Sequence, residues 1–171
     1  MRFWRRVLTA LPKADFDAFV CGNIPDPPTD PEAADVLAYA ELAALVGDAT
    51  LGSSVSRQLW RTRPETIRDR RGLFTGVGEV LVDVLPLVGS GVRPDRGSEL
   101  DRFVDVHARV RAERDTPRFR AQLLHDATDR DRRIHRYWAL TAQLAGTATT
   151  IGHAHGWLFD ALSRPQERLD N

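Results

Sequence analysis

The chain has 171 residues, of which 42% are hydrophobic and 28% charged, a mixture typical of a globular protein with a single domain and a substantial core. Its 24 basic and 24 acidic residues give a formal net charge of zero. Proteins dedicated to nucleic acids or to membrane surfaces usually carry an excess of positive charge. The balance therefore argues against both classes, although it leaves room for a local basic patch.

Other features of the composition favour a bacterial cytosolic protein. Lys13 is the only lysine, and this preference for arginine, together with abundant Ala, Asp, Val and Leu, is typical of a GC-rich genome such as that of an actinobacterium. Cys21 is the only cysteine, which excludes an internal disulfide and favours a reducing compartment. No apolar run resembles a signal peptide or approaches the roughly 20 residues that span a bilayer. We therefore expect a soluble, cytoplasmic protein.

Residues 1–22 are expected to form two short helices. The apolar positions of Phe3–Ala10 have helical spacing, and a second helix, Ala14–Val20, is expected to end at Gly22, a natural residue for the position after a helix. Residues 23–29 are rich in proline and predict a rigid connector.

The main bundle is expected to cover residues 30–164. Asp30, followed by a proline and an acidic residue, predicts the N-cap of a helix that runs to Val46. Asp48 predicts the cap of the next helix, which is expected to continue to Trp60.

Three further features follow in the middle of the chain. Thr62–Glu65 has the spacing of a capping box and predicts a charged helix that runs to Arg71. The valines of the apolar stretch Val77–Val88 favour a strand, but the spacing of its apolar residues favours a buried helix that is distorted or ends near Pro86. A loop is expected at residues 89–97.

The last third of the chain gives the strongest helical patterns. Ser98 predicts a capping box, and Thr116 followed by a proline predicts another helix start. A helix from about Asp129 to Gly146 and a last one from about Thr149 to Ser163 complete the bundle, and residues 165–171 form a polar tail. The inner stripe of the helix that follows Ser98 consists of Leu100, Phe103, Val104, His107 and Val110. The stripe of the helix before Gly146 consists of Ile134, Tyr137, Trp138, Thr141 and Ala145.

No strand-like alternation, hairpin signal or fixed repeat occurs in the sequence. We therefore predict an all-α protein, an irregular bundle of about seven to nine short helices.

The five histidines lack the spacing of a metal site. Sites of the His-Glu-x-x-His type need two histidines on one helical face. His153 and His155 are two residues apart, which on a helix directs them about 200° from each other. We expect hydrogen-bonded or solvated histidines, and neither a metal nor a cofactor.

No catalytic motif stands out. Cys21 lies near a helix end where the helix dipole does not favour a thiolate, and the chain has no Gly-x-Ser-x-Gly elbow. Gly76-Val-Gly78 lacks the third glycine of a dinucleotide loop and the lysine of a phosphate loop, so we interpret it as a flexible lead-in to the apolar helix. Enzymatic function stays open only through an acid or base assembled by the fold, such as His135 or His153.

Aromatic side chains are frequent in the middle and late helices. Core packing is their common role, but a cavity between helices, with aromatic walls and a few polar groups, is the competing interpretation. Gly146, Gly152 and Gly156 would let a ligand approach the backbone closely. The candidate ligand-binding residues are Trp60, Phe74, Phe103, His135, Tyr137, Trp138, Thr141 and Trp157.

The charged run Asp129–Arg136 directly precedes the aromatic pair Tyr137 and Trp138. Charges three and four residues apart are typical of a solvated helix start. A role in an interface or in nucleic-acid contact is the alternative.

Short motifs occur in Leu59–Arg68, Glu113–Phe119, Arg136–Leu140 and Gly156–Leu162. Together they resemble the C-terminal effector regions of some actinobacterial MerR-type transcriptional regulators, over roughly residues 30–162. The resemblance implies a helical module that encloses a small hydrophobic or peptide-like ligand. Such regulators begin with a winged helix-turn-helix and a long dimerisation helix, and residues 1–22 resemble neither. We therefore expect a stand-alone or excised effector domain that does not itself bind DNA.

The sequence thus favours a small-molecule-binding domain of the effector or sensor type, with an apolar or antibiotic-like ligand in an aromatic-lined cavity. An enzyme of secondary metabolism is one alternative. A helical protein-interaction module, which dimerises through its first helix, is another. We expect no membrane partner.

Overall fold

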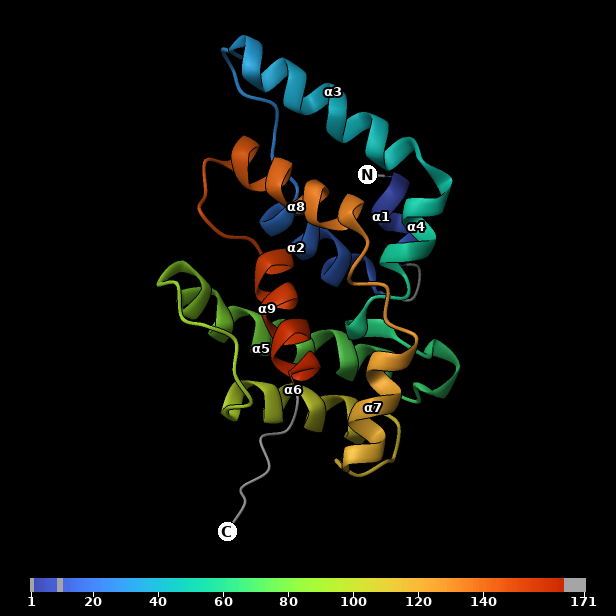
Figure 1. Cartoon of the computed structure of the whole chain (residues 1–171). Helices are drawn as coiled ribbons and strands as arrows, with labels where there is room; N and C mark the ends of the chain where they lie inside the picture. Colours follow the sequence, from blue (N-terminus) through green and yellow to red (C-terminus); the bar gives the residue numbers. More distant parts are fainter. Residues whose placement is uncertain (1, 9–10, 165–171) are drawn as a thin grey trace.

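The computed structural model describes residues 2–8 and 11–164, and all regular secondary structure in these ranges is helical (Figure 1). The prediction of an all-α irregular bundle is confirmed. The expected end of the first helix at Ala10 and the polar tail, residues 165–171, lie outside the described residues. The α-helices are α1 (Arg2–Val7), α2 (Lys13–Asn23), α3 (Ala33–Gly47), α4 (Ala49–Val55), α5 (Arg70–Gly89), α6 (Ser98–Arg109), α7 (Pro117–His125), α8 (Arg132–Ala145) and α9 (Ile151–Ser163). Two short 3₁₀ turns, η1 (Leu59–Arg61) and η2 (Pro64–Thr66), lie between α4 and α5.

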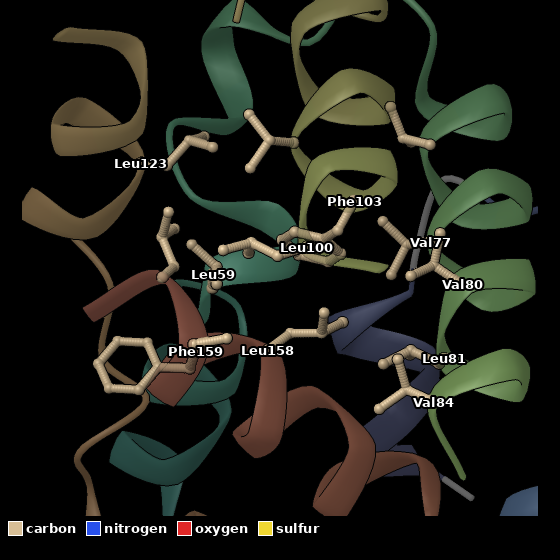
Figure 2. Packing of buried hydrophobic residues seen from close by; sticks show 14 of the residues in the cluster. Leu59, Val77, Val80, Leu81, Val84, Leu100, Phe103, Leu123, Leu158 and Phe159 are labelled. Carbon is tan, nitrogen blue, oxygen red and sulfur yellow. The ribbon is translucent and has the colours of Figure 1, made fainter. Parts of the chain in front are cut away.

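The helices pack around two hydrophobic clusters. The first, here the α5–α9 core, combines buried side chains of η1, α5, α6, α7 and α9. In Figure 2 the side chains of Leu100 and Phe103 on α6 point between Leu59 on one side and Val77 of α5 on the other. Phe103 and Leu100 are fully buried, so the inner face of α6 contributes to the centre of this core, while Asp101 and Asp105 on its other face are exposed.

The second cluster, here the α1–α8 core, combines side chains of α1, α2, α4 and α8. Its largest members are Trp4, Tyr137 and Trp138, all buried. Trp60 and Ile151 pack against both clusters. In Figure 1, α9 lies between the group formed by α1, α2, α3, α4 and α8 and the group formed by α5, α6 and α7.

Helix α5 supplies much of the α5–α9 core. It begins after Asp69, whose carboxylate accepts a hydrogen bond from the Gly72 amide at 2.8 Å, and it packs along both α6 and α9. The helix passes through Pro86 and ends at Gly89, slightly beyond the expected end. Gly76 lies inside α5, so its interpretation as a flexible lead-in was wrong. A Cβ there would lie 2.9 Å from a methyl carbon of Val106, which shows that glycine is needed for the close approach of α5 to α6.

Helix α5 is also long and apolar enough to cross a membrane. Helices α3 and α4 together meet the same criterion as a single broken span, but they are bent by 80°. In this fold α5 is a core helix, with one face buried against α6 and α9, and core helices of that kind commonly meet a length and hydropathy criterion.

Three predicted helix boundaries are confirmed by capping contacts. The Asp48 carboxylate accepts from the Thr50 amide at 2.8 Å, and the Thr116 hydroxyl accepts from the Phe119 amide at 3.1 Å. Gly146 ends α8 in the left-handed conformation, with φ of 63°.

Three other expected boundaries were wrong by one to three residues. Helix α3 begins at Ala33 rather than after Asp30, since Glu32 and Asp35 form the reciprocal capping box. Gly97, not Ser98, occupies the N-cap of α6. Helix α2 continues through Gly22 to Asn23.

The segment between α4 and α5 also differs from expectation. Helix α4 ends at Val55 and does not reach Trp60. Thr62 opens no helix, because Arg63 adopts the left-handed conformation, with φ of 53°, and only the single turn η2 follows. Helix α8 starts after Asp131, since the Asp129 carboxylate is turned toward the amide of Leu59.

Candidate ligand-binding cavity

A cavity of about 440 Å³ lies where the two cores meet. Helices α1, α2, α5, α8 and α9 and the segment around η1 all contribute to its walls. Its lining is formed by Trp4, Leu8, Asp15, Ala18, Phe19, Asn23, Gln58, Trp60, Phe74, Thr75, Val77, Gly78, Leu81, Val82, Trp138, Ile151, Gly152 and His155.

Aromatic rings form a connected wall of the cavity. The ring centroid of Trp4 lies 4.9 Å from that of Phe19 and 5.7 Å from that of Trp138. Phe19 in turn lies 6.3 Å from Phe74, so the contacts link α1, α2, α5 and α8. The position of Trp4 is fixed by a buried hydrogen bond of 2.7 Å that its indole N–H donates to the Tyr137 hydroxyl. Such an array of rings offers a large apolar contact surface with few freely rotating bonds.

Two glycines shape the cavity. A Cβ at Gly152 would overlap the Trp138 indole, so glycine lets the first turn of α9 lie directly against α8. Gly78 has the opposite environment: it lines the cavity, and a Cβ there would meet no atom within 4 Å. The open volume above Gly78 is therefore part of the site.

Most polar groups in the lining are already engaged. Asn23 donates to the Phe19 carbonyl at 2.9 Å, and Gln58 donates to Asp129 at 3.4 Å. Asp15 differs, because its Oδ2 is buried and forms no regular hydrogen bond. The nearest cationic group, Nε of Arg71, lies 3.2 Å away at an angle too oblique for one.

A buried polar network closes one side of the cavity. His155 accepts the backbone N–H of Trp60 on Nε2 at 3.0 Å, which assigns the ring proton to Nδ1 in the neutral tautomer. That Nδ1 lies 3.0 Å from Oδ1 of Asp129, although obliquely, and the other oxygen of Asp129 accepts the Leu59 amide at 2.7 Å. The network joins the α7–α8 loop, η1 and α9 at the cavity wall.

Three other histidines, His107, His135 and His153, form contacts with groups of the protein itself. Burial, and then the nearby Arg111 and His155, lower the pKa of His107 well below its ordinary value. Burial, and then His135, lower the pKa of His153, whose Nδ1 accepts the Thr150 amide in a capping contact. His135 donates to the Asp129 carbonyl at 2.7 Å. Over residues 2–8 and 11–164, no group of three His, Cys, Asp or Glu side chains is arranged to hold a metal ion.

The structure brings three of the candidate residues together and separates the rest. Trp60, Phe74 and Trp138 line the cavity. Tyr137 contacts it only indirectly, through Trp4, and Thr141 donates to the Tyr137 carbonyl at 2.9 Å.

The remaining three candidates lie elsewhere. Phe103 is fully buried beside His107 in the α5–α9 core, and His135 is exposed on α8. Trp157 is buried, and its indole donates to the Val92 carbonyl at 2.8 Å, which ties α9 to the loop after α5.

Sequence reasoning missed the contribution of the N-terminal helices. Trp4, Asp15 and Phe19 come from the segment that was expected to precede the main bundle. The helical spacing of Asp15 and Phe19, four residues apart, does show that they share one face of α2. What no local pattern shows is which helix that face meets.

No protein-family model, no curated protein and no solved structure matches the chain. The functional inference therefore rests on the geometry of the cavity.

Proposed function

We propose that the protein binds an apolar small molecule in this cavity, as a sensor or effector domain. The observation that carries the proposal is the connected aromatic wall around a space of about 440 Å³. Sites for drug-sized ligands have volumes of roughly 300–1,000 Å³, mostly apolar walls and a few placed polar groups. The cavity has each of these properties.

The His155–Asp129 pair supports a second candidate function, acid–base catalysis. A buried histidine beside a carboxylate at a cavity wall is a common arrangement for a general base. In this protein the lone pair of Nε2, which would take the proton, already accepts the Trp60 amide. Catalysis would require that hydrogen bond to break, whereas ligand binding requires no rearrangement of the network.

The resemblance to MerR-type effector regions agrees with a binding function, and a role in transcriptional regulation stays a prediction that rests on the resemblance alone. A bacterial, cytoplasmic setting stays a prediction as well. The apolar face of α1 is not available for dimerisation, because Phe3, Trp4 and Val7 are buried in the α1–α8 core. A dimer through α1 would have to use its other face.

A neutral fluorescent probe tests the proposal directly. Titration with N-phenyl-1-naphthylamine should raise probe emission, quench tryptophan emission and increase the melting temperature of the protein, since a ligand that binds only the folded state stabilises it. Gly78→Leu places a side chain in the open part of the cavity and should weaken binding at least about tenfold without loss of stability, because leucine favours helices more than glycine does.

Glu79→Leu is the matched control. It adds the same side chain one position along α5, at an exposed residue outside the lining, and should leave the probe affinity unchanged. Saturable binding that is equal in wild type and Gly78→Leu would show that the probe binds elsewhere. Absence of any binding by a series of neutral apolar probes would contradict the proposed function.

A further inference from the structure

We infer that the ligand is a hydrophobic amine, whose ammonium group pairs with Asp15 while its apolar body contacts the aromatic wall. The inference rests on the proposed function and specifies the chemical class of the ligand.

The charge of the cavity lining supports this class. Of its residues only Asp15 and His155 are ionisable, and no lysine or arginine belongs to the lining. Both nitrogens of His155 face groups of the protein, the Trp60 amide and the Asp129 carboxylate. The Asp15 carboxylate is therefore the charged group that a ligand would meet, and it attracts a cation and repels an anion.

The position of Asp15 joins this charge to the aromatic wall. Asp15, Ala18 and Phe19 all line the cavity from one face of α2, and residues four apart on a helix are neighbours. An ammonium beside Asp15 would thus lie close to the Phe19 ring, and aromatic rings attract cations over their faces. A single aromatic amine can use both contacts at once.

The Asp15 carboxylate has only a weak partner within the protein. Oδ2 is buried and has no regular hydrogen bond, and the guanidinium of Arg71 approaches it obliquely at 3.2 Å. The Arg71 side chain is 70% exposed, and ion pairs with so exposed a partner contribute little. Arg71 can move into solvent when a ligand cation takes its place.

Three naphthalene probes that differ in one group test the inference at neutral pH and low salt. They are 2-(1-naphthyl)ethylamine, 2-(1-naphthyl)ethanol and 1-naphthaleneacetate, each measured by calorimetric titration. We expect the amine to bind about five- to tenfold more tightly than the alcohol, and the carboxylate to bind most weakly.

Three variants assign the preference to Asp15. Asp15→Asn should abolish the difference in affinity between the amine and the alcohol. Arg71→Gln should increase the affinity for the amine, because it removes the competing cation; a purely structural role of the Asp15–Arg71 pair would not produce this gain. Asp17→Asn changes an exposed carboxylate on the same helix that pairs with Lys13, and should leave all three affinities unchanged.

The outcomes separate the two proposals. If the three probes bind with equal affinity, or if Asp15→Asn keeps the preference for the amine, the inference about the ligand is overturned and the binding function stands. If neither these probes nor the neutral N-phenyl-1-naphthylamine bind, both proposals are overturned.

Discussion

Replacement of Gly152 with alanine should destabilise the protein, whereas the same replacement at Gly156 should stabilise it. Both glycines lie in α9, but a Cβ at Gly152 would overlap the Trp138 indole, and a Cβ at Gly156 would meet no atom within 4 Å. Trp138 is 6% exposed and contacts the rings of Trp4 and Tyr137, at centroid distances of 5.7 and 5.1 Å, so it cannot withdraw without displacing them.

The magnitudes follow from two opposing effects. Forcing a methyl group into packed surroundings costs about 1–3 kcal/mol. Glycine in a helix costs roughly 0.5–1 kcal/mol relative to alanine, and both variants recover part of this. We therefore expect Gly152→Ala to lose about 0.5–2.5 kcal/mol of unfolding free energy and Gly156→Ala to gain up to about 1 kcal/mol.

Urea unfolding followed by tryptophan fluorescence and by circular dichroism measures both changes. For a chain of this size, 1 kcal/mol corresponds to a shift of roughly 2–4 °C in melting temperature. Because Trp138 also lines the cavity, Gly152→Ala should weaken probe binding as well. Equal stabilities of the two variants would refute the close contact between α8 and α9.

Two further predictions concern buried polar groups. Burial, Arg111 and His155 lower the pKa of His107 in the folded state, so between that lowered pKa and about 6.5 the unfolded chain binds more protons and the free energy of unfolding falls as the pH falls. Urea unfolding at several pH values should show this loss, and His107→Gln should reduce its slope; a slope unchanged by the substitution would contradict the assignment. Asp129→Ala should cost about 2–4 kcal/mol, because it leaves the Leu59 amide and a buried histidine without their carboxylate. In thermal unfolding, Asp126→Ala in the same loop, at an exposed position, is the control, and equal melting temperatures of the two variants would rule out the network as a stabilising element.

The helices and their buried faces were predictable because both depend on local spacing. All five residues of the expected α6 stripe are buried, and four of the five expected on α8 are, Ala145 being exposed. Caps were less predictable, since several residues near a helix start compete for the same amides. Glu32, not Asp30, is the N-cap of α3, because Asp35 three residues later serves as its reciprocal partner in the capping box.

The candidate site was predictable only in part, because it is assembled from residues far apart in the chain. Trp138 and Trp60 could be proposed from their residue type. Their neighbour Trp4 could not, since its hydrogen bond to Tyr137 joins residues separated by 133 positions. The Asp129–His155 network likewise depends on how the α7–α8 loop meets α9, and no periodicity in either segment indicates that contact.

The place of the cavity between two cores has a consequence for how this protein can evolve. Side chains that would complete the packing there are missing, so a bound molecule would serve as a shared piece of both cores. Substitutions that fill the space, at Gly78 above all, would make the domain more stable and at the same time close the proposed ligand site. Selection for stability alone would close this cavity, and selection for binding would keep it open.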